Sequence, residues 1–229
     1  MRVIVTGVTG MVGEGVLLEC LANPAVSEVL ALSRRPSGHS HPKLSELLIA
    51  DFRELELERS GSASFDERLR GYDGCFYCAG ISSVGLDEAA YGVITYDTPL
   101  ALARALVRVN PSMTFVHVSG SHTDSSEQGK VMWARVKGKA ENALTALPFA
   151  GVVHFRPSLM KPVDGQRHVK KAFRFFLVFF PLLSLLFPAL TLQQVARAML
   201  QCARERPRAV YEVPDIAAAA ARFDSAPGA

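Results

Sequence analysis

The feature that most constrains this chain is a glycine-rich turn near its start, Gly7-Val8-Thr9-Gly10-Met11-Val12-Gly13. The turn follows an apolar run at residues 2–6 that is typical of a buried strand. It opens a segment in which Val12, Val16 and Cys20 recur at the spacing of a helix packed on a sheet. Glycines in this setting permit a tight turn, a close approach of a ligand to the backbone and close packing of the helix on the strand.

The start of that helix would supply unpaired N–H groups and the positive end of the helix dipole, which favour an anion. The pattern therefore predicts that the turn binds the pyrophosphate of a dinucleotide; the alternative is a turn that binds no ligand. The residues predicted to form this part of the site are Gly7, Thr9, Gly10, Met11, Val12 and Gly13.

Short β-branched apolar runs alternate along the chain with longer segments of helical period, as expected for parallel strands joined by helices. The expected strands are residues 2–6, 29–32, 47–50, 74–78, 114–118, 152–155 and 210–213. The expected helices are residues 11–22, 65–69, 99–109, 131–147 and 192–204. We therefore predict an α/β fold of the doubly wound Rossmann type, with a mostly parallel seven-stranded sheet and helices on both faces.

The composition suits one domain spanning residues 1–229, because a chain of 229 residues with 49% hydrophobic content can bury one substantial core. The formal net charge of +3 is spread along the chain except for a basic cluster at residues 168–174. This distribution gives no support to nucleic-acid binding, whereas a small anionic ligand would suit it. Residues 217–221 near the C-terminus are expected to form a short helix or a frayed tail without chemistry.

The four cysteines form no regular framework, which predicts a reducing compartment rather than a secreted disulfide scaffold. Cys75 and Cys78 fall within one predicted strand, where residues three apart face opposite sides, so we predict no metal site there. His117 and His154 also lie in predicted strands and are expected to be hydrogen-bonded core residues. Because the first predicted strand begins at Arg2, we expect no leader peptide and a cytoplasmic location.

The residues that follow the second predicted strand bear on the choice of cofactor. The strand ends Ser33-Arg34-Arg35, where a protein selective for NAD(H) would usually place an acid on the ribose hydroxyls. Two guanidinium groups would instead suit a 2′-phosphate, because arginine and phosphate pair through two parallel hydrogen bonds. We therefore favour NADP(H), with NAD(H) as the alternative; a solvated surface pair of arginines is the structural interpretation.

At this point the chain resembles the short-chain dehydrogenase/reductase superfamily, in its atypical branch of NAD(P)-dependent epimerase/dehydratase-like proteins and Tat-interacting reductase-like proteins. The resemblance extends over nearly the whole chain. It rests on motifs after successive predicted strands and on the helix before the sixth strand: Thr6 to Gly13, Asp51-Phe52, Cys78-Ala79-Gly80, Val118-Ser119-Gly120, Val136-Lys137-Gly138-Lys139-Ala140-Glu141 and Phe155-Arg156-Pro157-Ser158.

The resemblance implies a role for several of these positions. Asp51 and Phe52 would hold the adenine, and the run Cys78-Ala79-Gly80 would pass beside the ribose and pyrophosphate. Lys137 would hydrogen-bond the nicotinamide ribose, and the pair Pro157-Ser158 would approach the nicotinamide. Each position also has a structural interpretation, as a turn, a solvated lysine or a loop breaker.

This chain departs from the catalytic pattern of the superfamily. The pattern is a tyrosine four residues before a lysine on one helix face, so that the lysine lowers the tyrosine pKa. Trp133 stands four residues before Lys137, and an indole N–H cannot exchange a proton usefully near neutral pH. Trp133 is expected to form a wall of the substrate site or to be a core residue.

The companion serine of the superfamily is also displaced. Strict alignment from the fifth strand puts Gly120 at that position, whereas a shift of one residue would let Ser121 serve, and Ser119 stands one residue before it. His122 and Thr123 add further groups that can donate or relay a proton. The catalytic candidates are therefore Lys137, Ser119 and Ser121.

An uncharged apolar segment at residues 175–192 approaches the length needed to span a membrane, but Pro181 and Pro188 interrupt it. A spanning helix would also separate the last predicted strand from its sheet. We interpret residues 157–192 as the substrate-side or lid region, and residues 172–192 as an alternative peripheral membrane or homodimer contact.

Three functions are compatible with these patterns. The first is an NADP(H)-binding oxidoreductase or epimerase-like protein that acts on a small or lipophilic carbonyl or alcohol substrate. The second is a catalytically weak protein that senses NADP(H) or regulates a partner, which the missing tyrosine permits. The third is a peripheral membrane protein anchored by the apolar segment.

Overall fold

The computed structural model describes residues 1–57, 67–169, 180 and 188–225. Within these residues, the predicted strands assemble into a sheet whose order is β3-β2-β1-β4-β5-β6-β9. Every neighbouring pair is parallel, which confirms the predicted seven-stranded, mostly parallel sheet. The strands are β1 (Arg2–Thr6), β2 (Glu28–Ser33), β3 (Leu44–Leu48), β4 (Gly74–Tyr77), β5 (Thr114–Val118), β6 (Gly151–Phe155) and β9 (Arg208–Tyr211).

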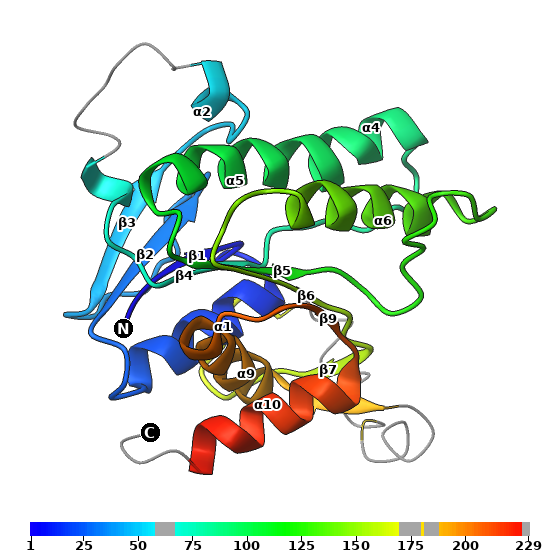
Figure 1. Cartoon of the computed structure of the whole chain (residues 1–229). Helices are drawn as coiled ribbons and strands as arrows, with labels where there is room; N and C mark the ends of the chain where they lie inside the picture. The colour runs from blue at the N-terminus through cyan, green and yellow to red at the C-terminus, as the bar shows by residue number, and fades with distance from the viewer. Residues whose placement is uncertain (58–66, 170–179, 181–187, 226–229) are drawn as a thin grey trace.

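Helices cover both faces of this sheet, as predicted (Figure 1). One face carries α1 (Met11–Ala22), α9 (Leu192–Glu205) and α10 (Val213–Ser225). The other carries α2 (Glu54–Leu57), α5 (Thr98–Val109) and α6 (Met132–Thr145), and α5 is preceded by α4 (Glu88–Gly92) and the π-helix η1 (Val93–Asp97). The predicted helix at residues 65–69 lies partly outside the described residues. Its described part, residues 67–69, is helical.

Alternation along the strands divides the apolar interior into two cores. In β1, Val3 and Val5 pack with α1 and α9, whereas Ile4 packs with the side of α5. Successive side chains of a strand point to opposite faces, and a parallel sheet covered on both faces therefore needs apolar residues at every position.

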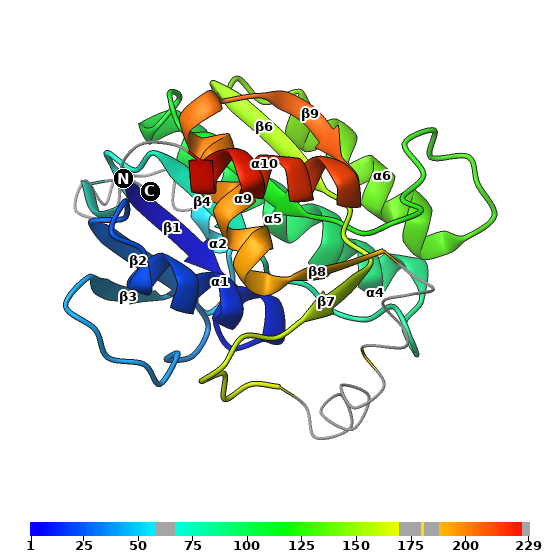
Figure 2. The same ribbon diagram turned by 90° about the horizontal axis from the view of Figure 1, so that it is seen from below.

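A second, two-stranded sheet joins the ends of the predicted substrate-side region. In it β7 (Leu159–Lys161) pairs in parallel with β8 (Ala189–Thr191), beside the start of α9 (Figure 2). The apolar segment predicted at 175–192 and the contact predicted at 172–192 lie outside the described residues, except for 180 and 188–192. Within the described part of the chain, no helix combines the length and the apolar character needed to cross a membrane.

The strand order reverses between β1 and β4, which is where ligands bind in open parallel sheets, at the carboxyl ends of the strands. Backbone and side-chain hydrogen bonds bring the loops at this edge together. Thr6 Oγ1 accepts from the backbone N–H groups of Cys78 and Ala79, at 3.1 and 3.3 Å. Ser121 N donates to Pro157 O at 3.2 Å, which joins the loops after β5 and β6.

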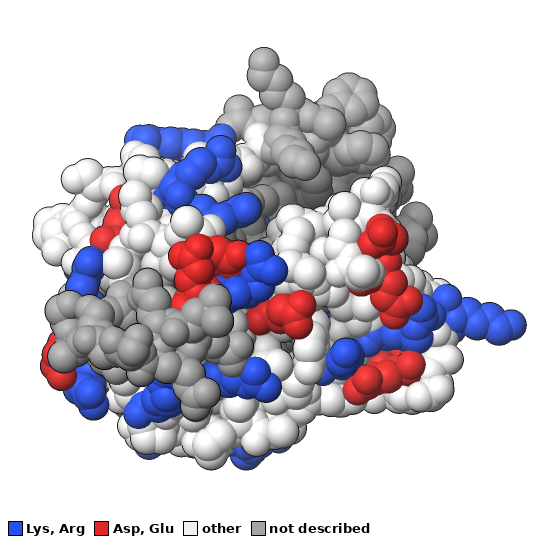
Figure 3. Space-filling view, turned by 90° about the horizontal axis from the view of Figure 1, so that it is seen from above, with Lys and Arg blue, Asp and Glu red and all other residues white. Residues whose placement is uncertain are grey.

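Lys and Arg are interspersed with Asp and Glu over most of the face viewed in Figure 3, and several Lys or Arg side chains lie together at its upper left. This agrees with the scattered charges along the sequence.

Candidate functional site

The phosphate turn between β1 and α1 has the close contacts that its glycines predict. Gly7 has a φ of +69°, and a Cβ there would lie 2.6 Å from the carbonyl oxygen of Cys78. A Cβ on Gly13 would lie 2.3 Å from the carbonyl oxygen of Gly7. No side chain can occupy these two positions without moving backbone atoms, so the turn is packed tightly against α1 and against the residues that follow β4.

Gly10 differs from its two neighbours in the motif because it is exposed, and a Cβ there would approach only Gly7 O, at 3.4 Å. Gly10 is the N-cap of α1 and provides no side-chain cap, so N–H groups of the first helical turn remain available to an anion. Thr9, Met11 and Val12 are partly exposed around it. These residues fit a pyrophosphate, because the surface is open at the one glycine where a ligand must come close.

The loop after β2 presents the two arginines predicted to select the cofactor. Arg34 and Arg35 are exposed, while the buried Ser33 donates from Oγ to the carbonyl oxygen of Arg35 at 2.6 Å. Ser37 N donates to Glu46 Oε1 at 2.8 Å, which ties the loop to β3. No acidic side chain stands at the end of β2, where ribose hydroxyls would need an acceptor.

The residues predicted to hold the adenine follow β3. The carboxylate of Asp51 is paired with Arg53, whose Nη2 lies 2.5 Å from Oδ2, and this hydrogen bond lowers the Asp51 pKa. The charge of Arg34 lowers it further. The ring of Phe52 is buried in the core, so its contribution to a ligand would come from its main chain.

The loop after β4 lies against the phosphate turn through its hydrogen bonds to Thr6. Gly80 is exposed and a Cβ there would meet nothing within 4 Å, which leaves open space beside the turn. Cys75 and Cys78 pack with opposite cores, as predicted for residues three apart on a strand. Burial raises the pKa of the Cys78 thiol, so it stays protonated and acts as a packing group.

Lys137 on α6 lies over the loop after β5. A Cβ at Gly120 would be 3.7 Å from Lys137 Cε and 3.9 Å from Nζ. Burial lowers the pKa of the Lys137 amine, while the carboxylate of Glu141 one turn later opposes the shift. Position 120 therefore faces the lysine, as strict alignment suggested, and it carries no hydroxyl.

The two serines predicted as catalytic candidates lie on either side of Gly120. Ser119 is buried and its Oγ lies 3.1 Å from Thr123 Oγ1, which itself donates to the carbonyl oxygen of Gly120 at 2.7 Å. Ser121 is partly exposed, and His122 is exposed with a φ of 65°. Ser119 thus has a partner within the loop, whereas Ser121 lies nearer the surface.

Three other predicted residues frame this end of the site. Trp133 is partly exposed one turn before Lys137, and a side chain in that position can contact both core and ligand. Pro157 is buried and Ser158 is exposed after β6, at the same sheet edge. The structure therefore gathers the cofactor and catalytic candidates of the sequence along one edge.

Sequence reasoning did not recognise the role of Gly138, which fixes the position of Lys137. A Cβ on Gly138 would lie 1.8 Å from the carbonyl oxygen of Asp124, and Asp124 N donates to Ala134 O at 3.1 Å. The helix backbone therefore rests directly on the loop after β5. A glycine inside an otherwise helical pattern was the available signal.

A buried ion pair holds α6 to the end of β6. Arg156 Nη2 donates to Glu141 Oε2 at 2.5 Å and to Ser125 Oγ at 2.6 Å. The Glu141 side chain is 2% exposed and the Arg156 side chain 13%, so the pair is largely removed from solvent. It fixes the helix that carries Lys137.

His117 and His154 are buried side by side on neighbouring strands, as core residues, with their Nδ1 atoms 3.3 Å apart. His154 Nε2 lies 2.9 Å from Thr145 Oγ1. Burial lowers the pKa of His154 to about 4, and burial together with His154 lowers that of His117 well below its usual value. Both rings are therefore neutral at physiological pH.

A second residue that the sequence did not single out is Glu14 in the first turn of α1. Its buried carboxylate accepts from Arg167 N and His168 N, each at 2.7 Å, and from His39 Nε2 at 2.9 Å. Burial alone would raise the Glu14 pKa, but these donors together lower it. A charged residue on the buried side of a helix was its only signal in the sequence.

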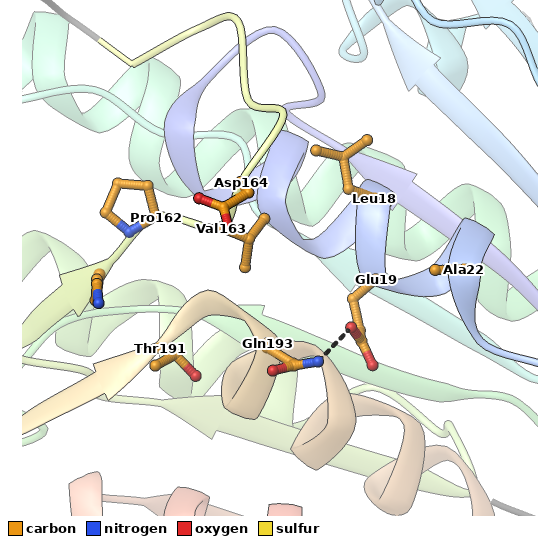
Figure 4. A pocket seen from close by; sticks show the side chains of 9 residues that line it. Leu18, Glu19, Ala22, Pro162, Val163, Asp164, Thr191 and Gln193 are labelled. Carbon is orange, nitrogen blue, oxygen red and sulfur yellow. Dashed lines mark hydrogen bonds between the residues drawn. The ribbon is translucent and has the colours of Figure 1, made fainter.

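A pocket of about 390 Å³ lies between the second half of α1 and the start of α9 (Figure 4). Gln193 Nε2 donates to Glu19 Oε2 across it at 3.2 Å. None of the predicted cofactor or catalytic residues lines it. Its lining residues are Leu18, Glu19, Ala22, Lys161, Pro162, Val163, Asp164, Thr191 and Gln193.

The sequence model of the NAD dependent epimerase/dehydratase family matches residues 3–131. The chain belongs to this family. The resemblance to the atypical branch of the short-chain dehydrogenase/reductases is thereby confirmed. Membership of this family supports a nicotinamide dinucleotide as the cofactor. It indicates that the chain is a nucleotide-binding protein similar to oxidoreductases and epimerases.

One relative is "Protein fmp52, mitochondrial" of Emericella nidulans, which is 29% identical over 176 residues, or 72% of this chain and 68% of the relative. Among solved structures, WbmF of Bordetella bronchiseptica in complex with NAD+ superposes with a TM-score of 0.66 at 18% identity, covering 97% of this chain and 77% of that one. UDP-glucose 4-epimerase of Thermus thermophilus in complex with NAD gives 0.64 at 18% identity, covering 99% and 85%. Both likenesses show the same fold.

The predicted cytoplasmic location is contradicted by the relatives. The fmp52 proteins of Emericella nidulans, Aspergillus fumigatus and Aspergillus clavatus are all named mitochondrial, as is fmp52-1 of Aspergillus terreus. The expectation rested partly on the unpaired cysteines. Free thiols indicate a reducing compartment without distinguishing one such compartment from another.

Proposed function

We propose that this protein binds NADP(H) and uses it to convert a small or lipophilic carbonyl or alcohol substrate. The observation that carries the proposal is the pair of exposed guanidinium groups, Arg34 and Arg35, directly after β2 and beside the open phosphate turn. A 2′-phosphate would supply the negative charge that these groups lack, because no acid ends β2.

The other cofactor contacts in this proposal follow the edge of the sheet. The phosphate turn would hold the pyrophosphate, and the loops at Asp51-Phe52 and Cys78-Ala79-Gly80 would border the adenine and ribose. Pro157 and Ser158 would border the nicotinamide. NADP(H) would supply the hydride, and the chain would bind it, orient the substrate and exchange a proton.

Lys137 is the proposed acid–base group. Its amine lies over Gly120, and burial brings its pKa down towards the range in which an amine exchanges protons. Trp133 cannot perform this transfer and is proposed as a wall of the substrate site. Ser121 at the surface and Ser119 beneath it would hydrogen-bond the substrate or the amine.

The test measures oxidation of NADPH over a panel of carbonyl compounds, with binding followed by energy transfer from Trp133, the only tryptophan of the chain. In Lys137→Met we expect turnover to fall at least about a hundredfold, the usual contribution of a positioned acid–base group. Lys139→Met is the matched control, because Lys139 is exposed on the same helix and its Nζ lies 4.4 Å from the ring centroid of Tyr96. Unchanged turnover in Lys137→Met would overturn the assignment of this residue.

The second candidate function is that of a catalytically weak NADP(H) sensor. A specific observation favours it, because Trp133 and Gly120 remove the expected hydroxyl groups from the surroundings of Lys137. Under this proposal the wild-type protein binds NADPH without turnover. Turnover that appears only in the double variant Trp133→Tyr with Gly120→Ser would support the sensor; comparable turnover in the wild type would contradict it.

Residues 157–192 are proposed as the substrate side of the site. β7 and β8 lie near the two ends of this range and pair with each other, and β8 leads directly into α9. The proposed peripheral membrane or homodimer contact at 172–192 concerns residues that are mostly outside the described part of the chain. Vesicle flotation and a sedimentation measurement on the intact chain would test the two alternatives directly.

A further inference from the structure

A segment near the start of the substrate-side region is bound to the loop that carries Arg34 and Arg35. Arg167 Nη1 donates to the carbonyl oxygen of Gly38 at 2.6 Å, and His168 Nε2 lies 3.2 Å from the carbonyl oxygen of Ser37. These two side chains reach the loop from more than a hundred residues further along the chain. The loop that follows β2 is therefore partly fixed by residues 167–168.

The carboxylate of Glu14 holds this segment in place from below. It accepts from the main-chain N–H groups of Arg167 and His168 and from the ring of His39, as described above. Two of these three partners lie in the segment and one lies in the loop after β2. Because the carboxylate is fully buried and satisfied, it fixes the spacing between segment and loop.

The same segment also contacts the helix that begins at the phosphate turn. Gln166 Nε2 donates to the carbonyl oxygen of Met11 at 2.6 Å, and a Cβ on Gly15 would lie 3.2 Å from Gln166 Oε1. Residues 166–168 therefore contact both α1, which begins at the glycine-rich turn, and the loop after β2. This places the segment beside the adenosine half of the site rather than the nicotinamide half.

The guanidinium of Arg167 is exposed and uses one nitrogen on Gly38. Neighbouring carboxylates are already engaged elsewhere: Glu14 by the donors named above, Glu46 by Ser37 N, and Asp51 by Arg53. Within the described part of the chain, none of Arg34, Arg35 and Arg167 has a carboxylate within ion-pair distance. Two arginines of the loop after β2 and one that hydrogen-bonds the same loop are thus without an ion-pair partner among the described residues, although the charge of Arg34 acts on Asp51 at longer range.

We propose that Arg167 is a third basic residue of the 2′-phosphate site, delivered by the substrate-side segment, and that Glu14 is the residue that positions it. The inference rests on the proposed binding of NADP(H) and adds a determinant of its selectivity. The guanidinium fork keeps one nitrogen on Gly38 and directs the remaining N–H groups to the phosphate. Coenzyme selectivity is thereby tied to the part of the chain that borders the substrate.

The test uses 2′,5′-ADP and 5′-AMP, which differ only by the 2′-phosphate, in calorimetric titrations of the intact protein. In Arg167→Gln we expect affinity for 2′,5′-ADP to fall at least about tenfold, as for loss of a charge-assisted hydrogen bond, with 5′-AMP within about twofold. Arg34→Gln is the positive control. Arg108→Gln, which removes an exposed charge on α5, is the negative control.

Glu14→Gln tests the positioning role through the ratio of the two affinities. An amide keeps the shape but turns one acceptor into a donor, so the hold on Arg167 or His39 is weakened. We expect the preference for 2′,5′-ADP to fall while binding of 5′-AMP persists. A purely structural role would reduce both affinities together or neither, and that result would overturn the role of Glu14.

Two outcomes separate this inference from the proposed function. If Arg34→Gln lowers the preference for 2′,5′-ADP and Arg167→Gln does not, NADP(H) binding stands and the role of Arg167 is overturned. If the wild-type protein binds the two probes equally, both the NADP(H) preference and the role of Arg167 are overturned.

Discussion

The phosphate turn and the β5–α6 region are anchored by the same device but differ in what they offer a ligand. In each, a helical glycine rests on backbone, with the Cβ of Gly13 falling 2.3 Å from Gly7 O and that of Gly138 falling 1.8 Å from Asp124 O. At the turn, Gly10 is exposed and begins α1 without a side-chain cap. In the β5–α6 region, the lysine is present, but Trp133 and Gly120 stand at the two positions where the superfamily pattern expects hydroxyls. The framework of a site and its reactive groups are thus separable.

The largest expected effect tests whether the β5–α6 region is locked as firmly as the turn. Gly138→Ala should destabilise the protein by about 3 kcal/mol, because its methyl group must displace the main chain of Asp124. Urea unfolding measures the change. Gly92→Ala is the matched control, since a Cβ at this helical position meets nothing within 4 Å, and its stability should not fall. Equal stabilities of the two variants would show that the loop at Asp124 moves easily to admit a methyl group. The β5–α6 region would then not be packed as tightly as the phosphate turn.

The next effect is the loss of stability at acid pH. We expect the buried histidines of β5 and β6 to contribute more to this loss than the phosphate turn does. His154 is neutral in the folded protein down to a pKa of about 4, whereas an unfolded histidine binds a proton near pH 6.5. Between these values the unfolded state holds more protons, so stability is complete above pH 6.5 and falls as the pH drops towards 4. At pH 5 this loss is about 2 kcal/mol for His154.

We therefore expect His154→Gln to lose less stability between pH 7 and pH 5 than the wild type, as measured by urea unfolding at each pH. His122→Asn is the control, because His122 is exposed and asparagine tolerates its left-handed backbone conformation. An unchanged pH dependence in His154→Gln would mean that His154 does not govern the acid response.

The smallest expected change in stability is that of a variant in the phosphate turn. Gly10→Ala should alter the free energy of unfolding by no more than about 0.5 kcal/mol, since the position is extended and exposed. Its affinity for NADPH should nevertheless fall about tenfold or more, because the methyl group occupies the approach to the pyrophosphate. Calorimetric titration gives the affinity. Retained binding would place the dinucleotide elsewhere.

The sequence predicted those parts of the fold that local pattern determines. The strands at residues 2–6 and 114–118 and the helix at residues 11–22 match the structure at both ends, because apolar runs and turn residues delimit them. β3 begins at Leu44 rather than residue 47, and β9 ends at Tyr211 rather than residue 213. Both are edge strands with exposed positions, so their apolar pattern is weaker than that of a central strand.

The candidate site was predictable where a motif is contiguous and was not where its parts are distant in sequence. Gly7, Gly10 and Gly13 fall within seven consecutive residues, so the glycine-rich turn can be recognised from the sequence alone. The partners of Glu14 are at residues 39, 167 and 168, so no local window reveals why a carboxylate is buried there. Gly138 stood within a quoted motif, but the loop backbone that it contacts became visible only in three dimensions.

The contact between Gly7 and the chain at Cys78 has a consequence for synthesis on the ribosome. The backbone of Cys78 and Ala79, just after β4, leaves room only for a glycine at position 7, and Thr6 accepts hydrogen bonds from the N–H groups of the same two residues. A nascent chain that ends before Cys78 carries the whole glycine motif yet lacks the neighbour that shapes it. The proposed coenzyme site is therefore complete only well after its own motif has been translated, and ribosome-bound chains shorter than this should not be retained on an immobilised nucleotide.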